Sequence, residues 1–341
     1  MSEGQHDERC SVITLGTCGG PKLRVDRTGI STAIVVDDAV YIVDLGYGAS
    51  RQLIAAGYDY SQVRGIFVTH LHSDHISDLA NVLLYGWYQG LSDVRTPVTM
   101  LGPGSRGAPA PVHTFADDST LVNPDDPMPG FAESYRYLLQ AHSTDINDRI
   151  RDNLRPHPDT VLTARNIDIP SDIGFDPDNN NTPQMDPFEI YADEHVRVLA
   201  TLVAHAPMSP AFAFRFETAS GSVVVSGDTG PCANLERMAS GADVLVHEVI
   251  DEQWAESNYA DKPEKEREAM MLHHLSAHTS IEEVGKIAQR ASVGTLVLTH
   301  FVPGHLVPGR WHEASEHFDG ELVVARDLDR IGVGSSRTVQ A

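Results

Sequence analysis

The chain has 341 residues, 41% of them hydrophobic, and its formal net charge at pH 7 is −23. No stretch approaches the roughly 18 consecutive apolar residues of a membrane span, and the polar, acidic start lacks the apolar centre of a signal peptide, so a soluble, cytoplasmic protein without a membrane partner is expected. The strong negative charge argues against a nucleic acid partner, because it repels phosphates.

Short β-rich runs follow one another along the chain, separated in places by helical periodicity. A helix is expected over 49–57, ending at Gly57, a residue suited to a left-handed C-cap. Another is expected over 281–291, where Ser280 and Glu283 make a capping box. The expected strands are 11–16, 31–36, 39–44, 65–70, 97–102, 196–205, 211–218, 222–228, 243–249, 295–300 and 321–325. This pattern predicts two packed sheets covered by helices, a four-layer α/β fold in a single domain over 1–341.

Residues 105–195 depart from this pattern, with 17 acidic and six basic residues, many prolines and the run DPDNNN. Such a segment is open to two interpretations, a disordered insertion or a partly helical one. Ile146, Ile150 and Leu154 recur at helical spacing. We therefore expect an acidic, partly helical insertion that contains a flexible loop.

The segment THLHSDH, residues 69–75, follows an apolar run and concentrates metal-binding side chains. His70 and His72 are two apart and are expected to project to one side, while Asp74 and His75 fall in the turn that enters a helix. Imidazole nitrogens and one carboxylate at this spacing suit two neighbouring ions. Further candidates stand at the ends of later apolar runs: His205, Asp228 and His300. Any one of these alone is more simply a structural residue, but the ordered set predicts a metal centre.

These motifs as an ordered set resemble the metallo-β-lactamase-fold hydrolases, in the branch that includes ribonuclease Z and zinc arylsulfatase-like enzymes. The resemblance covers nearly the whole chain outside 105–195. It rests on LGTCGGP (15–21), VDLGYG (43–48), THLHSDH (69–75), AHAPMSPAFAFRFE (204–217), SGDTGP (226–231), VLVHEV (244–249), HTSIEEVGKIA (278–288) and LTHFVPG (298–304). It implies an αββα sandwich with two metal ions, most often zinc, with manganese or iron as alternatives.

The resemblance also implies a role for each candidate residue. One ion would be held by His70, His72 and His205, the other by Asp74, His75 and His300, with Asp228 bridging the pair. Asp44 would orient ligands from outside the metal centre. The implied catalytic residues are Asp74, which would orient the attacking hydroxide, and His247 and His278, which would approach the substrate.

In an enzyme of this family a metal-bridging hydroxide would cleave the substrate. Three hypotheses about the function of the chain compete. We expect a small-molecule ester, in an arylsulfatase-like or lactone- or ester-cleaving enzyme, with 105–195 as a lid over the active site. The alternative is a ribonuclease Z-type phosphodiesterase acting on tRNA 3′ ends. Against it, only 22 residues separate His205 from Asp228, where bacterial ribonuclease Z enzymes generally insert a tRNA-gripping arm. A catalytically silent binding module is the third reading.

Two further points stay open in the sequence. Trp87 and Trp311 would either line a pocket for an organic group or belong to the core. The oligomeric state is not determined, and a homodimer is compatible with the chain.

Overall fold

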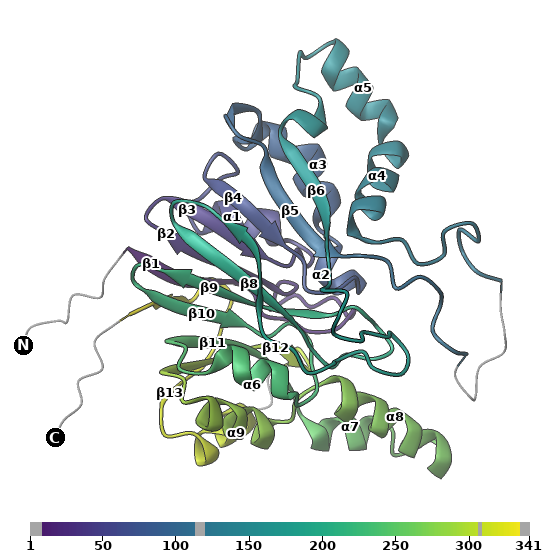
Figure 1. Ribbon diagram of the computed structural model, residues 1–341, viewed down its shortest axis with the longest axis vertical. Helices are drawn as coiled ribbons and strands as arrows, with labels where there is room; N and C mark the ends of the chain where they lie inside the picture. The colour runs from purple at the N-terminus through teal and green to yellow at the C-terminus, as the bar shows by residue number, and fades with distance from the viewer. Residues whose placement is uncertain (1–8, 113–119, 306–308, 335–341) are drawn as a thin grey trace, which may run out of the picture.

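Two β-sheets pack face to face, with helices on both outer faces, in the computed structural model of the chain (Figure 1). The structure describes residues 9–112, 120–305 and 309–334. The predicted four-layer αββα sandwich is confirmed. Among the described residues, no helix is both long and apolar enough to cross a membrane.

The first sheet has the strand order β14-β1-β2-β3-β4-β5-β6. Its pairing is antiparallel from β14 to β3 and parallel from β3 to β6. The strands are β1 (Cys10–Gly16), β2 (Ser31–Val36), β3 (Ala39–Val43), β4 (Val63–Phe67), β5 (Val98–Pro103), β6 (Leu162–Ile167) and β14 (Arg330–Gly332). The helices between them are α1 (Ala49–Ala55), α2 (Ser73–Ile76), α3 (Leu79–Tyr85), α4 (Phe131–Ala141) and α5 (Ser143–Arg151), with short 3-10 turns at 86–88, 91–93 and 158–160.

The second sheet has the order β13-β12-β11-β10-β9-β8-β7. It is antiparallel from β7 to β10 and parallel from β10 to β13. The strands are β7 (Phe188–Ala192), β8 (Val196–Leu202), β9 (Phe212–Thr218), β10 (Gly221–Val225), β11 (Val244–Ile250), β12 (Thr295–Val302) and β13 (Glu321–Val324). Its helices are α6 (Ala233–Ala239), α7 (Glu252–Asn258), α8 (Glu264–Ala277) and α9 (Ile281–Ala291), followed by the 3-10 helix η4 (Arg310–His317).

The central strands are buried on both faces, which explains why they read as nearly continuous apolar runs. Strand β11 shows the pattern, because Val244 and Val246 belong to the core between the sheets while Leu245 belongs to the core beneath the outer helices. Aromatic rings join the two sheets: Phe67 of β4 packs edge-on against Phe216 of β9, with ring centroids 5.3 Å apart. The two sheets therefore share one hydrophobic core.

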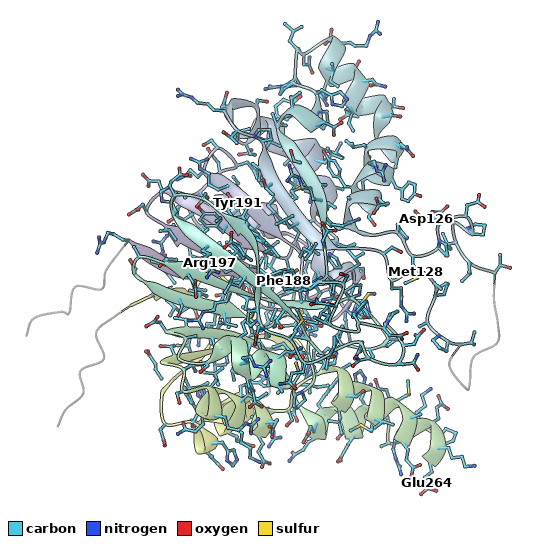
Figure 2. All side chains as sticks on the ribbon, viewed as in Figure 1. Asp126, Met128, Phe188, Tyr191, Arg197 and Glu264 are labelled. Atoms are coloured by element: carbon cyan, nitrogen blue, oxygen red, sulfur yellow. The ribbon has the colours of Figure 1, made fainter. Side chains whose placement is uncertain are left out.

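The segment 105–195 is partly helical, as predicted, but it also completes both sheets. Helices α4 and α5 lie within it, strand β6 forms the edge of the first sheet, and β7 forms the edge of the second. Figure 2 marks β7 by Phe188 and Tyr191, two partly buried side chains that pack against the core between the sheets. Residues 113–119 lie outside the described part of the chain. An edge strand has one unpaired side and mixed polarity, so β6 and β7, like the three-residue β14, lack the apolar run of a central strand.

Two helix boundaries test the capping predictions. The Ser280 side chain accepts a hydrogen bond from the Glu283 N–H at 3.3 Å, so it caps α9 as expected. The helix ends at Ala291, as predicted, and its C-cap residue Ser292 adopts a left-handed conformation with φ of 54°. Helix α1 is followed by Gly57, whose φ of 91° requires the conformational freedom of glycine.

Candidate metal centre

The loop after β4 carries the first group of predicted ligands across the ends of both sheets. The Val68 N–H donates to the Leu101 carbonyl in the first sheet, and the Thr69 carbonyl accepts from the Phe212 N–H in the second. His70 follows directly and is completely buried. The next residues begin α2, with His72 at its N-cap and Asp74 and His75 within it. The motif is therefore held by backbone bonds to both sheets.

The second sheet supplies three more predicted ligands at the same end of the sandwich. His205 and Asp228 follow the ends of β8 and β10, and His300 lies near the end of β12. All three are 2–3% exposed. His300 has a φ of 44°, in the left-handed region that a histidine rarely adopts. Such a conformation persists only where surrounding structure imposes it, and it is frequent at functional sites.

The seven predicted metal ligands come together in the structure. The donor atoms of His70, His72 and His205 lie within 4.8 Å of one another, and so do those of Asp74, His75 and His300. Asp228 lies between the two groups. Its Oδ1 is 3.3 Å from His75 Nε2 and 3.2 Å from His300 Nε2, while its Oδ2 is 3.9 Å from the Nε2 atoms of His70 and His205. One carboxylate thus faces both groups.

The remaining ring nitrogens are held from outside the cluster. The Asp44 carboxylate lies 2.8 Å from His75 Nδ1 and also accepts from the Thr69 N–H at 2.8 Å. The Ala277 carbonyl lies 2.8 Å from His205 Nδ1 and accepts its hydrogen. Such contacts fix the tautomer that presents Nε2 to a metal, a common feature of protein metal sites. The implied orienting role of Asp44 agrees with this position.

Burial and charge keep much of the cluster in a metal-binding protonation state. Burial lowers the pKa of His70 and of His72, and it lowers the pKa of His205 to about 3, so these imidazoles are neutral at pH 7. Burial also opposes ionisation of Asp228, but His300 and His75 outweigh it and hold the pKa of Asp228 well below its usual range. Only neutral imidazoles and ionised carboxylates bind metal ions.

His75 differs from its neighbours in the absence of a cation. Burial lowers its pKa, but Asp228, Asp44 and Asp74 together raise it well above the usual value. A proton on His75 therefore neutralises a surplus of carboxylate charge. A divalent cation in the same place would neutralise it equally well, so the donor set fits such an ion.

His278 lies beside the cluster and is oriented by a glutamate. Its Nδ1 is 3.3 Å from Glu248 Oε1 and 4.0 Å from Asp228 Oδ2. The same Glu248 oxygen accepts from the Thr229 and Thr279 N–H groups at 3.2 and 3.0 Å. Burial lowers the pKa of His278, but Glu248 and the neighbouring aspartates raise it to about 9. Glu248 was not predicted, although a charge inside the apolar run 243–249 was the available signal.

His247 does not join the other predicted catalytic residues. It is completely buried in β11, its Nδ1 lies 2.7 Å from the Glu248 carbonyl, and its Nε2 has no hydrogen-bond partner among the described residues. It is also not among the described residues that line the cavity over the cluster. A catalytic role for His247 stays a prediction.

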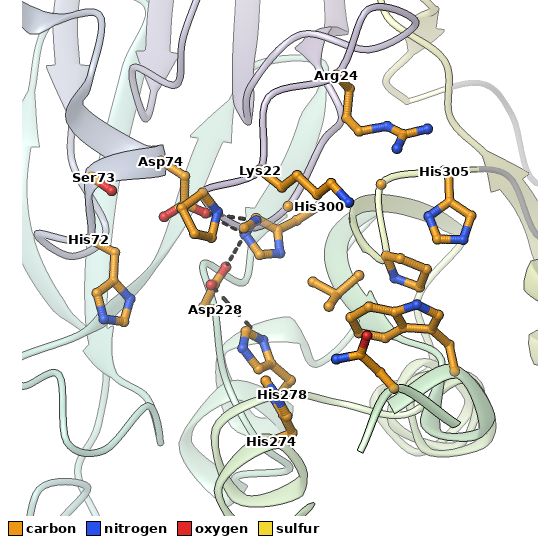
Figure 3. Close-up of a pocket in the computed structure, with 18 residues that line it drawn as sticks. Lys22, Arg24, His72, Ser73, Asp74, Asp228, His274, His278, His300 and His305 are labelled. Atoms are coloured by element: carbon orange, nitrogen blue, oxygen red, sulfur yellow. Dashed lines mark hydrogen bonds and ion pairs between the residues drawn. The ribbon is translucent and has the colours of Figure 1, made fainter. Parts of the chain in front are cut away.

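A cavity of about 420 Å³ opens over the cluster (Figure 3). The residues that line it include His72, Asp74 and His278, together with the cationic side chains of Lys22 and Arg24. No described residue of 105–195 lines it, so the lid stays a prediction. Trp87 and Trp311 are each 2% exposed and belong to the core. Residues 306–308, shortly before Trp311 in the sequence, lie outside the described part of the chain.

A buried cluster of histidines and aspartates at one end of an αββα sandwich defines a divalent-metal hydrolase, and comparison with known proteins identifies the family. The profile of the Metallo-beta-lactamase superfamily matches residues 26–322, so the chain belongs to this superfamily. Ribonuclease Z of Mycolicibacterium gilvum is 30% identical over 326 residues, covering 94% of this chain and 96% of that protein. Ribonuclease Z of Mycobacterium sp. strain KMS is 32% identical over 330 residues, covering 94% and 95%.

Solved structures share the fold at lower identity. Human tRNase Z, short form, has a TM-score of 0.60 at 17% identity, covering 95% of this chain and 99% of its own. The metallo-beta-lactamase fold protein YhfI from Bacillus subtilis has a TM-score of 0.57 at 18% identity, covering 94% and 98%.

Two predictions from the sequence are wrong in the light of these relatives. The expected small-molecule ester substrate, arylsulfatase-like or otherwise, is overturned by the full-length similarity to proteins named ribonuclease Z. The expectation that nucleic acid is not a partner is overturned by the same finding. The acidic segment 105–195 does not separate this chain from the proteins named ribonuclease Z, because an alignment that covers 94% of the chain includes most of that segment.

The error has a physical reason. A net charge is a sum over the whole chain and does not say where the charges lie. Here Lys22 and Arg24 stand at the cavity over the metal centre, although the total is −23. The local field that a phosphate meets at the cavity therefore differs from the average field of the molecule.

Proposed function

We propose that the chain is a ribonuclease Z-type phosphodiesterase that cleaves the 3′ extension of precursor tRNA. The observation that carries this proposal is the 30–32% identity to proteins named ribonuclease Z over 94% of the chain. The two cationic side chains at the cavity, Lys22 and Arg24, support it, because a phosphodiester backbone gains affinity from such groups.

We propose two zinc ions, held by the seven residues of the sequence prediction. His70, His72 and His205 would hold one, Asp74, His75 and His300 would hold the other, and Asp228 would serve both. The opposite orientation of the two Asp228 oxygens toward the two groups supports a bridge. Bound ions of this kind lower the pKa of a coordinated water toward neutrality and so supply a nucleophile.

The chain's own residues then position the reactants. The Gly20 N–H donates to Asp74 Oδ2 at 2.9 Å, which leaves the other carboxylate oxygen of Asp74 to orient the attacking water. His278, kept protonated by Glu248, donates a proton to the leaving oxygen on the Asp228 side of the cavity. Lys22 and Arg24 bind the neighbouring phosphate.

The test is cleavage of a precursor tRNA by protein of known metal content, with the product ends mapped to the nucleotide. We expect site-specific cleavage at the 3′ end, loss of that cleavage after chelation, and its return on adding zinc. Asp74→Asn should lower kcat by at least about 100-fold if it removes the group that orients the water. Glu256→Gln is the matched control, because it also removes one carboxylate charge but at an exposed position on α7.

Efficient turnover of aryl sulfates or aryl esters by the same preparation, with no precursor cleavage, would refute the proposal. Cleavage that persists in fully metal-free protein would refute the metal assignment.

A further inference from the structure

One wall of the cavity over the candidate metal centre is formed by residues that are neither predicted metal ligands nor the cations Lys22 and Arg24. Helix α7 supplies this wall through Trp254 and Asn258, and the end of β12 supplies Val302 and Pro303. The predicted metal ligands His72, Asp74 and Asp228 line the same cavity (Figure 3). A flat aromatic residue and an amide thus face a space that adjoins the metal ligands.

Trp254 differs from the other tryptophans of the chain. The side chains of Trp87 and Trp311 are each 2% exposed and pack in the core. Trp254 is only partly buried and lines the cavity. A partly exposed indole beside a phosphodiester site is well suited to stack on a base, because every nucleobase offers a π face.

The position of Trp254 is fixed by contacts at the start of α7. The buried carboxylate of Asp251 accepts hydrogen bonds from the Gln253 and Trp254 N–H groups, at 3.0 and 3.3 Å. Arg310 pairs with the same carboxylate at 3.3 Å. The Asp251 N–H donates to the Val302 carbonyl at 2.8 Å, which ties α7 to the β12 end of the cavity. The indole is therefore presented by an ordered helix start, which lowers the entropy lost on binding.

Asn258 lies four residues after Trp254, so the two side chains share one face of the helix. Asn258 is exposed, and it lines the cavity. An amide offers both a donor and an acceptor, the combination that pairs with the polar edge of a base.

We propose that Trp254 and Asn258 form a nucleobase-binding subsite for an unpaired nucleotide that flanks the scissile phosphate. Trp254 stacks on the base, Asn258 bonds to its edge, and Val302 and Pro303 at the end of β12 add apolar surface to the same wall. This inference rests on the proposed function for its substrate, but the subsite is defined by its own residues and has its own test.

The first test uses precursor tRNAs in which a single flanking nucleotide, on either side of the cleavage site, lacks its base. Trp254→Ala should raise KM for the intact substrate by about 5- to 150-fold, the range for loss of one stacked base, with little change in kcat. Trp254→Phe should restore most of the affinity. On the substrate that lacks the bound base, wild type and Trp254→Ala should have equal KM values. An equal loss on the intact and on both abasic substrates would show a merely structural role and overturn the proposal.

The second test does not depend on cleavage. Short single-stranded oligoribonucleotides should quench the tryptophan fluorescence of the wild type, because Trp254 is partly exposed while Trp87 and Trp311 are buried. The quenching should disappear in Trp254→Phe, weaken in Asn258→Ala, and persist in the surface control Glu256→Ala. Quenching without precursor cleavage would leave the subsite standing and refute the proposed function. Precursor cleavage with no quenching and no dependence on either base would refute the subsite alone.

Discussion

At the scale of single residues, the pair formed by Glu248 and His278 makes the pH dependence testable. Glu248 raises the pKa of His278 against the effect of burial. A proton donor loses activity as the pH rises through its pKa, so the proposed donor role of His278 predicts an alkaline limb in the profile. Glu248→Gln removes the charge that favours the protonated form, and the alkaline limb of kcat/KM should move to lower pH by about one unit.

The measurement is cleavage of precursor tRNA across the alkaline range, with Glu256→Gln as the control that removes an exposed carboxylate. An unchanged limb in Glu248→Gln would show that His278 is not the donor.

Asp44 gives a second residue-scale prediction, which concerns metal affinity. Its carboxylate holds His75 Nδ1 and the Thr69 N–H, so Asp44→Asn loosens a ligand without removing a donor atom. We expect metal affinity to fall by about 10- to 100-fold, as is usual when such a supporting contact is lost. Competition with a chelator of known affinity measures it. Asp78→Asn is the matched control, because Asp78 is also buried but its carboxylate bonds to Gly48, Ser50 and Asn81.

The sequence predicted which side chains meet at the centre better than it predicted what surrounds them. His70, His72, Asp74 and His75 share one short motif, and His205, Asp228 and His300 each follow or end an apolar run. Glu248 acquires its role only through contact with Thr279, 31 residues further along the chain. No local pattern separated Trp254 from the two tryptophans of the core. Contacts between distant segments are not encoded in spacing.

At the scale of secondary-structure elements, α9 shows how much a local pattern decides. Its apolar residues form one face, and its capping serine was visible in the sequence. Ser280→Ala should lower the free energy of unfolding by about 1 kcal/mol, because the Glu283 N–H loses its acceptor. Urea denaturation measures the change. Ser257→Ala is the control, since that exposed hydroxyl donates a hydrogen bond to the Gln253 carbonyl within its own helix. A loss no larger than the control's would show that the cap does not stabilise the helix.

The edge strands show where local patterns fail. Strand β7 alternates weakly, and its place in the sheet depends on pairing with β8. The sequence of segment 105–195 therefore predicted an insertion, although its strands β6 and β7 complete the two sheets. Helix α8 extends away from the sandwich, with Glu264 at its outer end (Figure 2).

At the scale of the whole molecule, the residues of the candidate metal centre come from both sheets. The motif of residues 70–75 follows a strand of the first sheet, and His205, Asp228 and His300 belong to the second. A metal ion that binds only the folded state should stabilise it by about 2.7 kcal/mol when the free ion concentration is about 100 times the dissociation constant. We expect chelation to lower the Tm in differential scanning calorimetry, and zinc to restore it. Asp228→Asn should show a smaller metal-dependent shift, and an equal shift would contradict the assignment of the bridge.

The overall charge predicts how binding responds to salt. A molecule with a net charge of −23 depends on a few local cations to hold a polyanion. Lys22→Ala should weaken tRNA binding and reduce the slope of log affinity against log salt by about one. Titrations at several salt concentrations test this. Lys286→Ala, which removes a lysine paired with Glu282 on α9, should leave the slope unchanged.

The return of the chain to its first sheet has a consequence for the order of folding. Strand β14 pairs with β1, aligning Gly332 with Ser11, so the sheet closes only after almost the whole described chain has been synthesised. Just before β14, Asp327 accepts hydrogen bonds from Thr17 and from the Thr28 N–H, at the two ends of the loop whose Gly20 N–H binds Asp74. Contacts over such sequence distances form slowly. The loop at the candidate metal centre therefore takes its final position only after the segment around Asp327 and β14 has joined the first sheet.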